Sequence, residues 1–148
     1  MSDEIQIRQM RTEDLAQVAA IEKATFSDAW SQEGFAESLA REDTVCLCAA
    51  SGQRVVGYAL LYTVLDEGEL MNIAVDETCR GQGIGRQLLN AVLAQGAERG
   101  IIDFYLEVRA GNLPAQKLYQ SAGFAVVGIR PDFYEKPREN AFLMSLHR

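Results

Sequence analysis

The apolar and polar positions in the N-terminal part of the chain change period twice. Ile5 and Ile7 alternate with polar residues, which predicts a short strand. Thr12 stands where a helix cap is expected, and one glutamate joins the apolar positions that recur at helical spacing after it: Leu15, Val18, Ala19 and Glu22. Ser31 has the same cap position before a second helix. Residues 26–30, between the helices, are expected to form a loop with exposed aromatic side chains.

The middle of the chain predicts three strands followed by a helix. Residues 44–50 and 55–65 are apolar runs that are typical of buried strands. The polar turn 66–68 leads into a third strand, 69–76, so the last two strands form a hairpin. The next helix ends at Gly100, which can adopt the backbone conformation of a C-terminal cap. Its apolar stripe consists of Ile84, Leu88, Ala91 and Val92.

The C-terminal part continues the alternation of strands and helices. A strand over 101–109 has two different faces: Phe104, Leu106 and Val108 on one, Tyr105, Glu107 and Arg109 on the other. Asn112 is placed to cap a helix that Gly123 ends. Residues 124–130 and 141–146 predict closing strands around a polar loop, 131–140. This order predicts a single α/β domain over residues 1–148, with helices on the faces of a mixed sheet.

Composition narrows the class of protein. The 148 residues are 48% hydrophobic, which is enough for a core, and no apolar run is long enough to span a bilayer. The acidic start, residues 1–4, lacks the basic region of a secretion signal. Cys46 and Cys48 alternate on one face of a strand, where they are poorly placed to bridge each other, so reduced thiols and a cytoplasmic location are expected. A single histidine, His147, leaves too few ligands for a metal site.

The net charge of −7, with a pI near 4.7, argues against nucleic acid as a partner. An acidic surface fits a cationic partner, although acidity also serves solubility.

A glycine-rich segment carries the strongest chemical signal in the chain. The apolar strand end 72–76 is followed by Arg80, three alternate glycines and then a helix. Helix N-terminal amides lack intrahelical partners, and glycines let a large anion approach them, so the segment predicts a phosphate-binding loop. A P-loop would require a Gly-Lys-Ser/Thr ending, and a dinucleotide-binding loop would require glycine in place of Arg86.

The remaining pattern, Arg-x-x-Gly-x-Gly after a strand, resembles the acetyl-CoA pyrophosphate loop of the GNAT family of N-acetyltransferases. The run 112–119 with Gly123-Phe124 resembles the second signature of that family, Asn-x-x-Ala-x-x-x-Tyr followed by Gly-Phe. Residues 72–76 and 106–110, with Arg130 and Phe133-Tyr134, are more narrowly similar to the ribosomal-protein-alanine N-acetyltransferases of the RimI type. The resemblance implies the GNAT fold, a mixed and mostly antiparallel sheet flanked by helices.

The resemblance also implies acetyl-CoA as the cosubstrate and places its contacts. The residues implied are Ile73, Ala74, Val75, Arg80, Gly81, Gln82, Gly83, Ile84, Gly85, Arg86, Asn112 and Lys117. The amide of Val75 would face the acetyl carbonyl, and a backbone donor of this kind lowers a barrier by roughly 3 kcal/mol. Asn112 would contact the pantetheine arm besides capping its helix. Lys117 is otherwise a solvated helix lysine.

Two residues would carry the proton transfers. In enzymes of the RimI type a glutamate at the position of Glu107 accepts the proton of the amine through water. In the GNAT family the tyrosine at the position of Tyr119 donates a proton to the departing sulfur. Without the resemblance, Glu107 would be a solvated strand residue and Tyr119 a core residue. Aromatic residues of segments that border the acceptor groove in the family could pack against a peptide: Trp30, Phe133 and Tyr134. Each is otherwise a cover over the core.

The acidity of amines favours one acceptor. An α-amine has a pKa of about 7.7–8.0 and lysine one of about 10.4, so neutralising lysine costs roughly 3.5 kcal/mol more. One carboxylate suits the easier substrate, so we expect a protein N-terminus to be acetylated by direct attack in a ternary complex. The resemblance to the RimI type implies that this acceptor is the N-terminal alanine of a small-subunit ribosomal protein. The alternatives are an acetyltransferase for a small amine, polyamine or lysine side chain, and a non-catalytic acyl-CoA-binding module.

Overall fold

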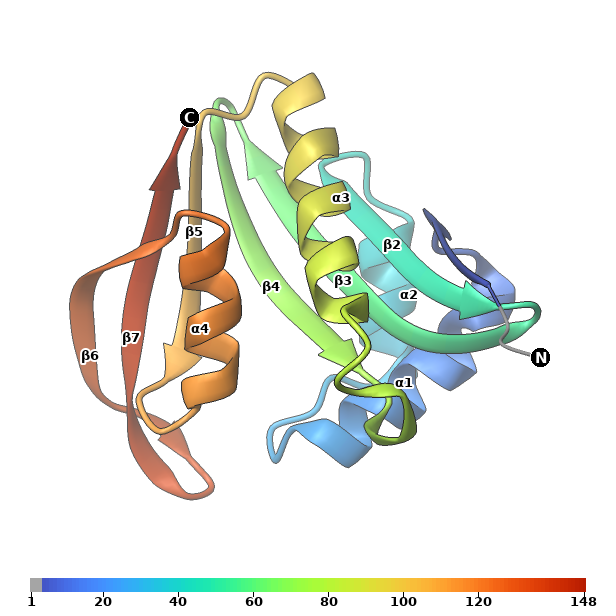
Figure 1. Cartoon of the computed structure of the whole chain (residues 1–148), viewed down its shortest axis with the longest axis horizontal. Helices are drawn as coiled ribbons and strands as arrows, with labels where there is room; N and C mark the ends of the chain where they lie inside the picture. Colours follow the sequence, from blue (N-terminus) through green and yellow to red (C-terminus); the bar gives the residue numbers. More distant parts are fainter. Residues whose placement is uncertain (1–3) are drawn as a thin grey trace.

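The structure, a computed structural model, describes residues 4–148. The expectation drawn from the acidic start of the chain falls mostly on residues 1–3, which lie outside the described residues. Seven strands form one sheet in the order β1-β2-β3-β4-β5-β7-β6 (Figure 1). The strands are β1 (Ile5–Gln9), β2 (Thr44–Ser51), β3 (Arg54–Val64), β4 (Glu67–Val75), β5 (Asp103–Arg109), β6 (Ala125–Glu135) and β7 (Arg138–His147). The helices are α1 (Leu15–Thr25), α2 (Gln32–Leu39), α3 (Ile84–Glu98) and α4 (Leu113–Ser121).

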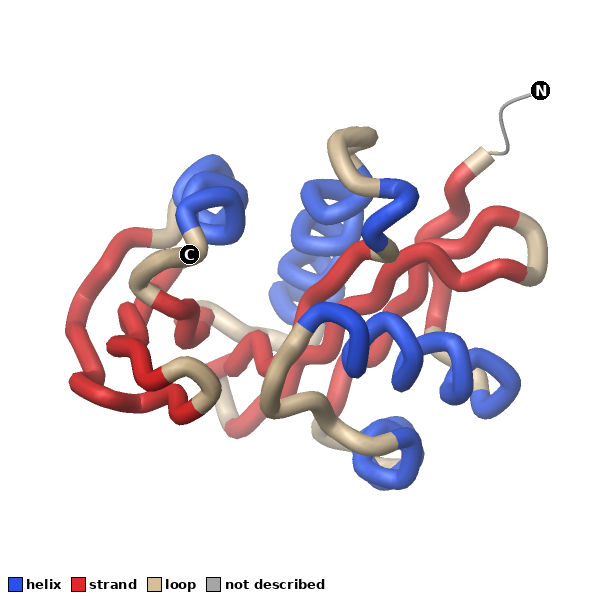
Figure 2. The backbone as a smooth tube through the Cα atoms, turned by 90° about the horizontal axis from the view of Figure 1, so that it is seen from below, coloured by secondary structure: helices blue, strands red, loops and turns tan. Residues whose placement is uncertain are grey.

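One strand pair breaks the antiparallel pattern of this sheet. β4 and β5 are parallel, and their pairing ends at Leu70 opposite Leu106. Beyond that point the two strands diverge, as Figure 1 shows. Helices α3 and α4 cover one face of the sheet and α1 and α2 the other (Figure 2). The predicted class, a mixed and mostly antiparallel sheet flanked by helices, is confirmed.

The two faces of the sheet have separate cores. Beneath α3 and α4 lies the larger one, which includes Leu88, Leu89, Val92, Phe104 and Leu106. Beneath α1 and α2 lies a smaller one that contains Val18, Phe35, Cys48, Tyr58 and Leu60. Cys46 belongs to this second core as well, and both thiols are free, so the expectation that they share one strand face is confirmed.

Local signals in the sequence placed most element boundaries correctly. The Ser31 hydroxyl accepts a hydrogen bond from the Gly34 amide at 3.1 Å. The Asn112 side chain likewise accepts from the Ala115 amide at 3.2 Å, so both predicted caps are confirmed. Gly100 has φ +88 just after α3, as the predicted C-terminal cap requires.

Two expectations about local structure were wrong. Thr12 does not cap α1 but opens a short 3-10 turn, Thr12–Asp14, and α1 begins at Leu15. The reason is Asp14, whose buried carboxylate accepts from the Arg11 amide and pairs with Arg8, both at 2.7 Å. Residues 131–140, predicted as a polar loop, mostly continue β6 and β7. β6 is an edge strand, where polar residues and a proline are tolerated because one side of the strand faces solvent.

Candidate functional site

The glycine-rich loop lies where β4 leads into α3, and two of its glycines are conformationally required. Gly81 and Gly83 both have φ +78, and a Cβ built on either would meet no atom within 4 Å. The space above them is therefore open. The first bond in this turn of α3 runs from the Gln87 amide to the Gly83 carbonyl at 3.1 Å. The amides before it have no intrahelical partner, so the loop fits a pyrophosphate.

Other residues of the loop divide into exposed side chains and buried ones. Arg80, Gln82 and Arg86 are exposed beside it, as is Lys117 on α4. Ile84 is buried in the larger core, so only its backbone faces the loop. Gly85 differs from the other two glycines, because a Cβ there would lie 3.5 Å from Leu118 of α4. That separation is an ordinary van der Waals contact, so an added methyl group would fit between α3 and α4.

The backbone of Val75 faces the divergence between β4 and β5. The Asp76 amide donates to the Val56 carbonyl of β3 at 2.7 Å. Successive strand amides point in opposite directions, so the Val75 amide points away from β3, to the side where pairing with β5 has ended. The Val75 carbonyl lies on that side too and accepts from Arg80 Nε at 3.2 Å. Of the neighbouring residues, Ile73 is half-buried and Ala74 buried.

Glu107 lies on the other strand of the divergence, on the face that α1 and α2 cover. The predicted alternation of β5 is confirmed: Leu106 and Val108 are buried in the larger core, and Glu107 points to the opposite face. Its side chain is 18% exposed, and Arg130 Nε lies 3.6 Å from Oε1. Oε2 is buried and has no hydrogen-bond partner among residues 4–148. Burial raises the pKa of Glu107, Arg130 opposes this shift, and Glu69 adds to it.

Tyr119 lies on α4, on the opposite side of the sheet from Glu107. Its side chain is buried and packs edge-on against Phe124, with ring centroids 6.1 Å apart. Burial raises the pKa of its phenol, with a smaller contribution from Tyr134, so the hydroxyl is protonated at neutral pH. Asn112 caps the same helix. The structure therefore places the two residues expected to transfer protons on opposite faces of the sheet: Glu107 on the side of α1 and α2, and Tyr119 in the core beneath α3 and α4.

The three aromatic residues expected at the acceptor groove have different surroundings. Tyr134 is half-buried under the Arg109 guanidinium, 4.2 Å from the ring centroid. Burial raises the pKa of Tyr134 to about 12, and the negative charge of Glu107 adds to this shift. Phe133 is exposed and packs against Tyr134 with centroids 5.0 Å apart.

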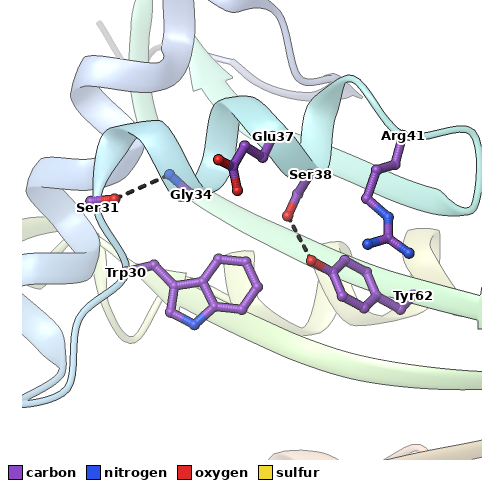
Figure 3. Close-up of a pocket in the computed structure, with 7 residues that line it drawn as sticks. All are labelled: Trp30, Ser31, Gly34, Glu37, Ser38, Arg41 and Tyr62. Atoms are coloured by element: carbon purple, nitrogen blue, oxygen red, sulfur yellow. Dashed lines mark hydrogen bonds between the residues drawn. The ribbon is translucent and has the colours of Figure 1, made fainter.

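Trp30 lines a cavity of about 360 Å³ between α2 and β3 (Figure 3). Its ring lies 5.4 Å from Phe35 and 6.4 Å from Tyr62, measured between centroids, so it is packed and half-buried rather than exposed as expected. Tyr62 pairs with Glu69, which in turn lies opposite Tyr105 of β5. Cross-strand partners share a face, so the Trp30 cavity lies on the Glu107 side of the sheet.

Sequence reasoning did not single out two buried polar residues on this face, Glu22 of α1 and Asn72 of β4. Glu22 had one available signal, because it shares the helical spacing of the apolar stripe of α1. A charged residue in such a stripe requires buried partners.

No group of three or more His, Cys, Asp or Glu side chains in residues 4–148 is arranged to hold a metal ion. No helix there combines the length and the hydropathy needed to cross a membrane.

Comparison with known proteins identifies the class. The model of the acetyltransferase (GNAT) family matches residues 15–124, which include the loop, Glu107 and Tyr119. The chain belongs to the GNAT family. It is accordingly an acetyl-CoA-dependent N-acetyltransferase, as the motifs predicted.

Within the family, the chain is similar to ribosomal-protein-alanine N-acetyltransferases. The [ribosomal protein bS18]-alanine N-acetyltransferase of Escherichia coli (strain K12) is 35% identical over 142 residues, which are 95% of each chain. The protein of that name from Haemophilus ducreyi is 44% identical over 96 residues, 63% of this chain and 66% of the relative. The crystal structure of the ribosomal-protein-S18-alanine N-acetyltransferase from Escherichia coli has a TM-score of 0.89 at 34% identity, covering 97% of this chain and 94% of that one.

Proposed function

We propose that this N-acetyltransferase acetylates the α-amine of the N-terminal alanine of ribosomal protein bS18. The names of its relatives support this acceptor. The observation that carries the proposal is Glu107, a carboxylate with a raised pKa and one buried, unpartnered oxygen at the strand divergence. We infer a cytoplasmic location, which the free thiols of Cys46 and Cys48 support.

Glu107 receives the proton of the acceptor amine. The raised pKa of Glu107 is closer to the pKa of an α-amine than the pKa of a solvated glutamate is. Proton transfer from the amine to Glu107 is therefore less unfavourable. Oε2 is free to accept the proton, directly or through a water, while Oε1 remains beside Arg130. A lysine amine, with a pKa of about 10.4, would be neutralised far less readily by this single group.

On the other side of the gap, acetyl-CoA supplies an activated acetyl group when it is bound. The amides at the start of α3 and the guanidiniums of Arg80 and Arg86 would hold its phosphates. Asn112 would contact its pantetheine arm, and Lys117 would contact a phosphate. The Val75 amide donates to the oxygen on which negative charge develops. Tyr119 is protonated and stands ready to donate to the leaving sulfur.

A panel of amines tests the acceptor. Peptides that begin with alanine, N-terminally blocked peptides with an internal lysine, and polyamines are compared by kcat/KM at fixed acetyl-CoA. We expect the alanine peptides to be preferred by at least about tenfold, and the peptide with the bS18 N-terminal sequence to be the best of them. Preference for a lysine or polyamine would overturn the proposal that an N-terminal alanine is the acceptor. Binding of acetyl-CoA without turnover of any of these amines would overturn the proposal that the protein acetylates them.

A further inference from the structure

The carboxylate of Glu22 is the centre of a buried network on the acceptor side of the sheet. Its side chain is 1% exposed. The Tyr58 hydroxyl donates to Oε1, and Asn72 Nδ2 donates to both oxygens at 3.1 Å. The Trp30 amide donates to Oε2 at 3.0 Å. One side chain of α1 thus ties together β3, β4 and the loop that carries Trp30.

This network fixes the orientation of the Asn72 amide. Glu22 accepts from three donors, so the nitrogen of the planar Asn72 amide must face it. The carbonyl oxygen, Oδ1, therefore points away from Glu22. It is fully buried and finds no hydrogen-bond donor in residues 4–148. Buried polar groups are nearly always paired, so an acceptor held in this way calls for an explanation.

The position of Asn72 in the sheet explains why its Oδ1 has no partner. In β3, Leu61 pairs with Leu70 and Leu60 with Asn72, so Met71 forms a bulge without a partner. The bulge turns Asn72 to the α1 face, two residues beyond the last pair between β4 and β5. Glu107 lies on this face, one residue beyond the same pair.

Asn72 Oδ1 and Glu107 Oε2 are the two buried side-chain oxygens that lack a partner in the described chain. They belong to the two strands that diverge, on the same face, at the point where the divergence begins.

We propose that Asn72 binds the acceptor amine through Oδ1, and that Glu22 is the positioning residue that aims it. This inference rests on the proposed function, because it assigns a contact to the same amine. A neutral amine has two N–H donors, which match the two unpartnered oxygens. A neutral amide suits this place better than a second carboxylate, because it accepts a hydrogen bond without favouring the protonated, unreactive form of the amine.

The test separates the KM of the acceptor from that of acetyl-CoA. The variant Asn72→Ala should raise the acceptor KM about tenfold, the effect of one lost hydrogen bond to a charged or polar ligand group. The KM for acetyl-CoA should stay within twofold of wild type. Asn72→Ser, which keeps a hydroxyl donor near Glu22 but does not extend to the position of Oδ1, should show the same separation.

Tyr58→Phe is the matched control for Asn72→Ala. It also removes one donor from Glu22 but leaves the Asn72 amide in place, so the acceptor KM should stay within twofold. Glu22→Gln should behave like Asn72→Ala, because a glutamine can donate to Oδ1 and turn the Asn72 amide around. The double variant Glu22→Gln with Asn72→Ala should have the same acceptor KM as Asn72→Ala alone, because both changes remove the same contact.

The outcomes distinguish this inference from the proposed acceptor. Kinetics use whichever amine the wild-type enzyme acetylates fastest, so a preference for lysine would overturn the alanine acceptor without deciding the role of Asn72. A wild-type acceptor KM in Asn72→Ala, with acetyl-CoA binding intact by calorimetry, would overturn the inference. An equal loss in Tyr58→Phe would also overturn it, because the network would then merely stabilise the fold. If neither Asn72 variant folds, Glu22→Gln against Tyr58→Phe decides the question.

Discussion

The guanidinium of Arg130 lies beside Oε1 of Glu107 and makes no hydrogen bond to Oε2. Nε lies 3.6 Å from Oε1, while Oε2 is buried and unpaired in the described residues. The Arg130 side chain is itself 54% exposed, so the pair is weakened by solvent. Arg130 therefore lowers the pKa of Glu107 from the level that burial alone would give, while Oε2 has no partner among the described residues.

Removing Arg130 should move the pH dependence of the enzyme. Burial raises the pKa of Glu107 and Arg130 lowers it, so Arg130→Ala should raise that pKa further. A base acts only when it is unprotonated, and the acidic limb of kcat/KM against pH should shift to higher pH. Arg130→Lys retains a positive charge and should shift less. A limb that stays in place in Arg130→Ala would show that another group titrates there.

Glu107→Gln keeps the shape of the side chain but removes the basic site. The rate should fall at neutral pH. It should partly recover as the pH rises through the pKa of the acceptor amine, because the amine in solution is then already neutral. For a peptide that begins with alanine the recovery should come near pH 8, and for a lysine acceptor near about pH 10. Profiles that superimpose on wild type at every pH would exclude Glu107 as the base.

Tyr119→Phe should separate catalysis from binding. The Tyr119 hydroxyl makes no hydrogen bond within residues 4–148, so its removal should leave the free energy of unfolding almost unchanged. The value of kcat should fall by about 10²–10⁴-fold, the usual contribution of a general acid, while the KM for acetyl-CoA is retained. Stopped-flow or steady-state kinetics at saturating acetyl-CoA would measure this. An unchanged kcat would leave Tyr119 with a packing role alone.

Gly83→Ala should weaken acetyl-CoA binding through the backbone. With φ +78 and no atom within 4 Å of an added Cβ, the alanine meets no clash. It does strain the left-handed conformation, by about 1–2 kcal/mol, and the loop should relax away from the geometry that exposes its amides. The KM for acetyl-CoA should rise several-fold.

Gly52→Ala is the control for Gly83→Ala. Gly52 has φ +61 and equally open surroundings, but it lies in the turn between β2 and β3. Its replacement should lower thermal stability by a similar amount and leave the KM for acetyl-CoA unchanged. An equal rise of that KM in both variants would mean that lost stability, rather than loop geometry, causes the effect.

What the sequence could predict follows the range of the interactions. The glycine loop, the caps at Ser31 and Asn112 and the two faces of β5 depend on neighbours within a few residues, and each was predicted in place. The orientation of Asn72 could not be predicted, because a one-residue bulge at Met71 decides to which face Asn72 points. This bulge is evident only once the pairing of β4 with β3 is known. The two side-chain partners of Glu22, Tyr58 and Asn72, lie 36 and 50 residues away along the chain, so spacing alone indicated that Glu22 is buried but not why.

The parallel pairing between β4 and β5 ends at Leu70 and Leu106, after four residue pairs. Beyond it, each strand has an unpaired inner edge, a surface that in other sheets invites aggregation. A ligand that lies in the divergence shields these edges as a missing strand would, and it links the half-sheet β1–β4 to the half-sheet β5–β7. We therefore expect the melting temperature of the enzyme to rise with substrate concentration, as the linkage of binding to folding requires.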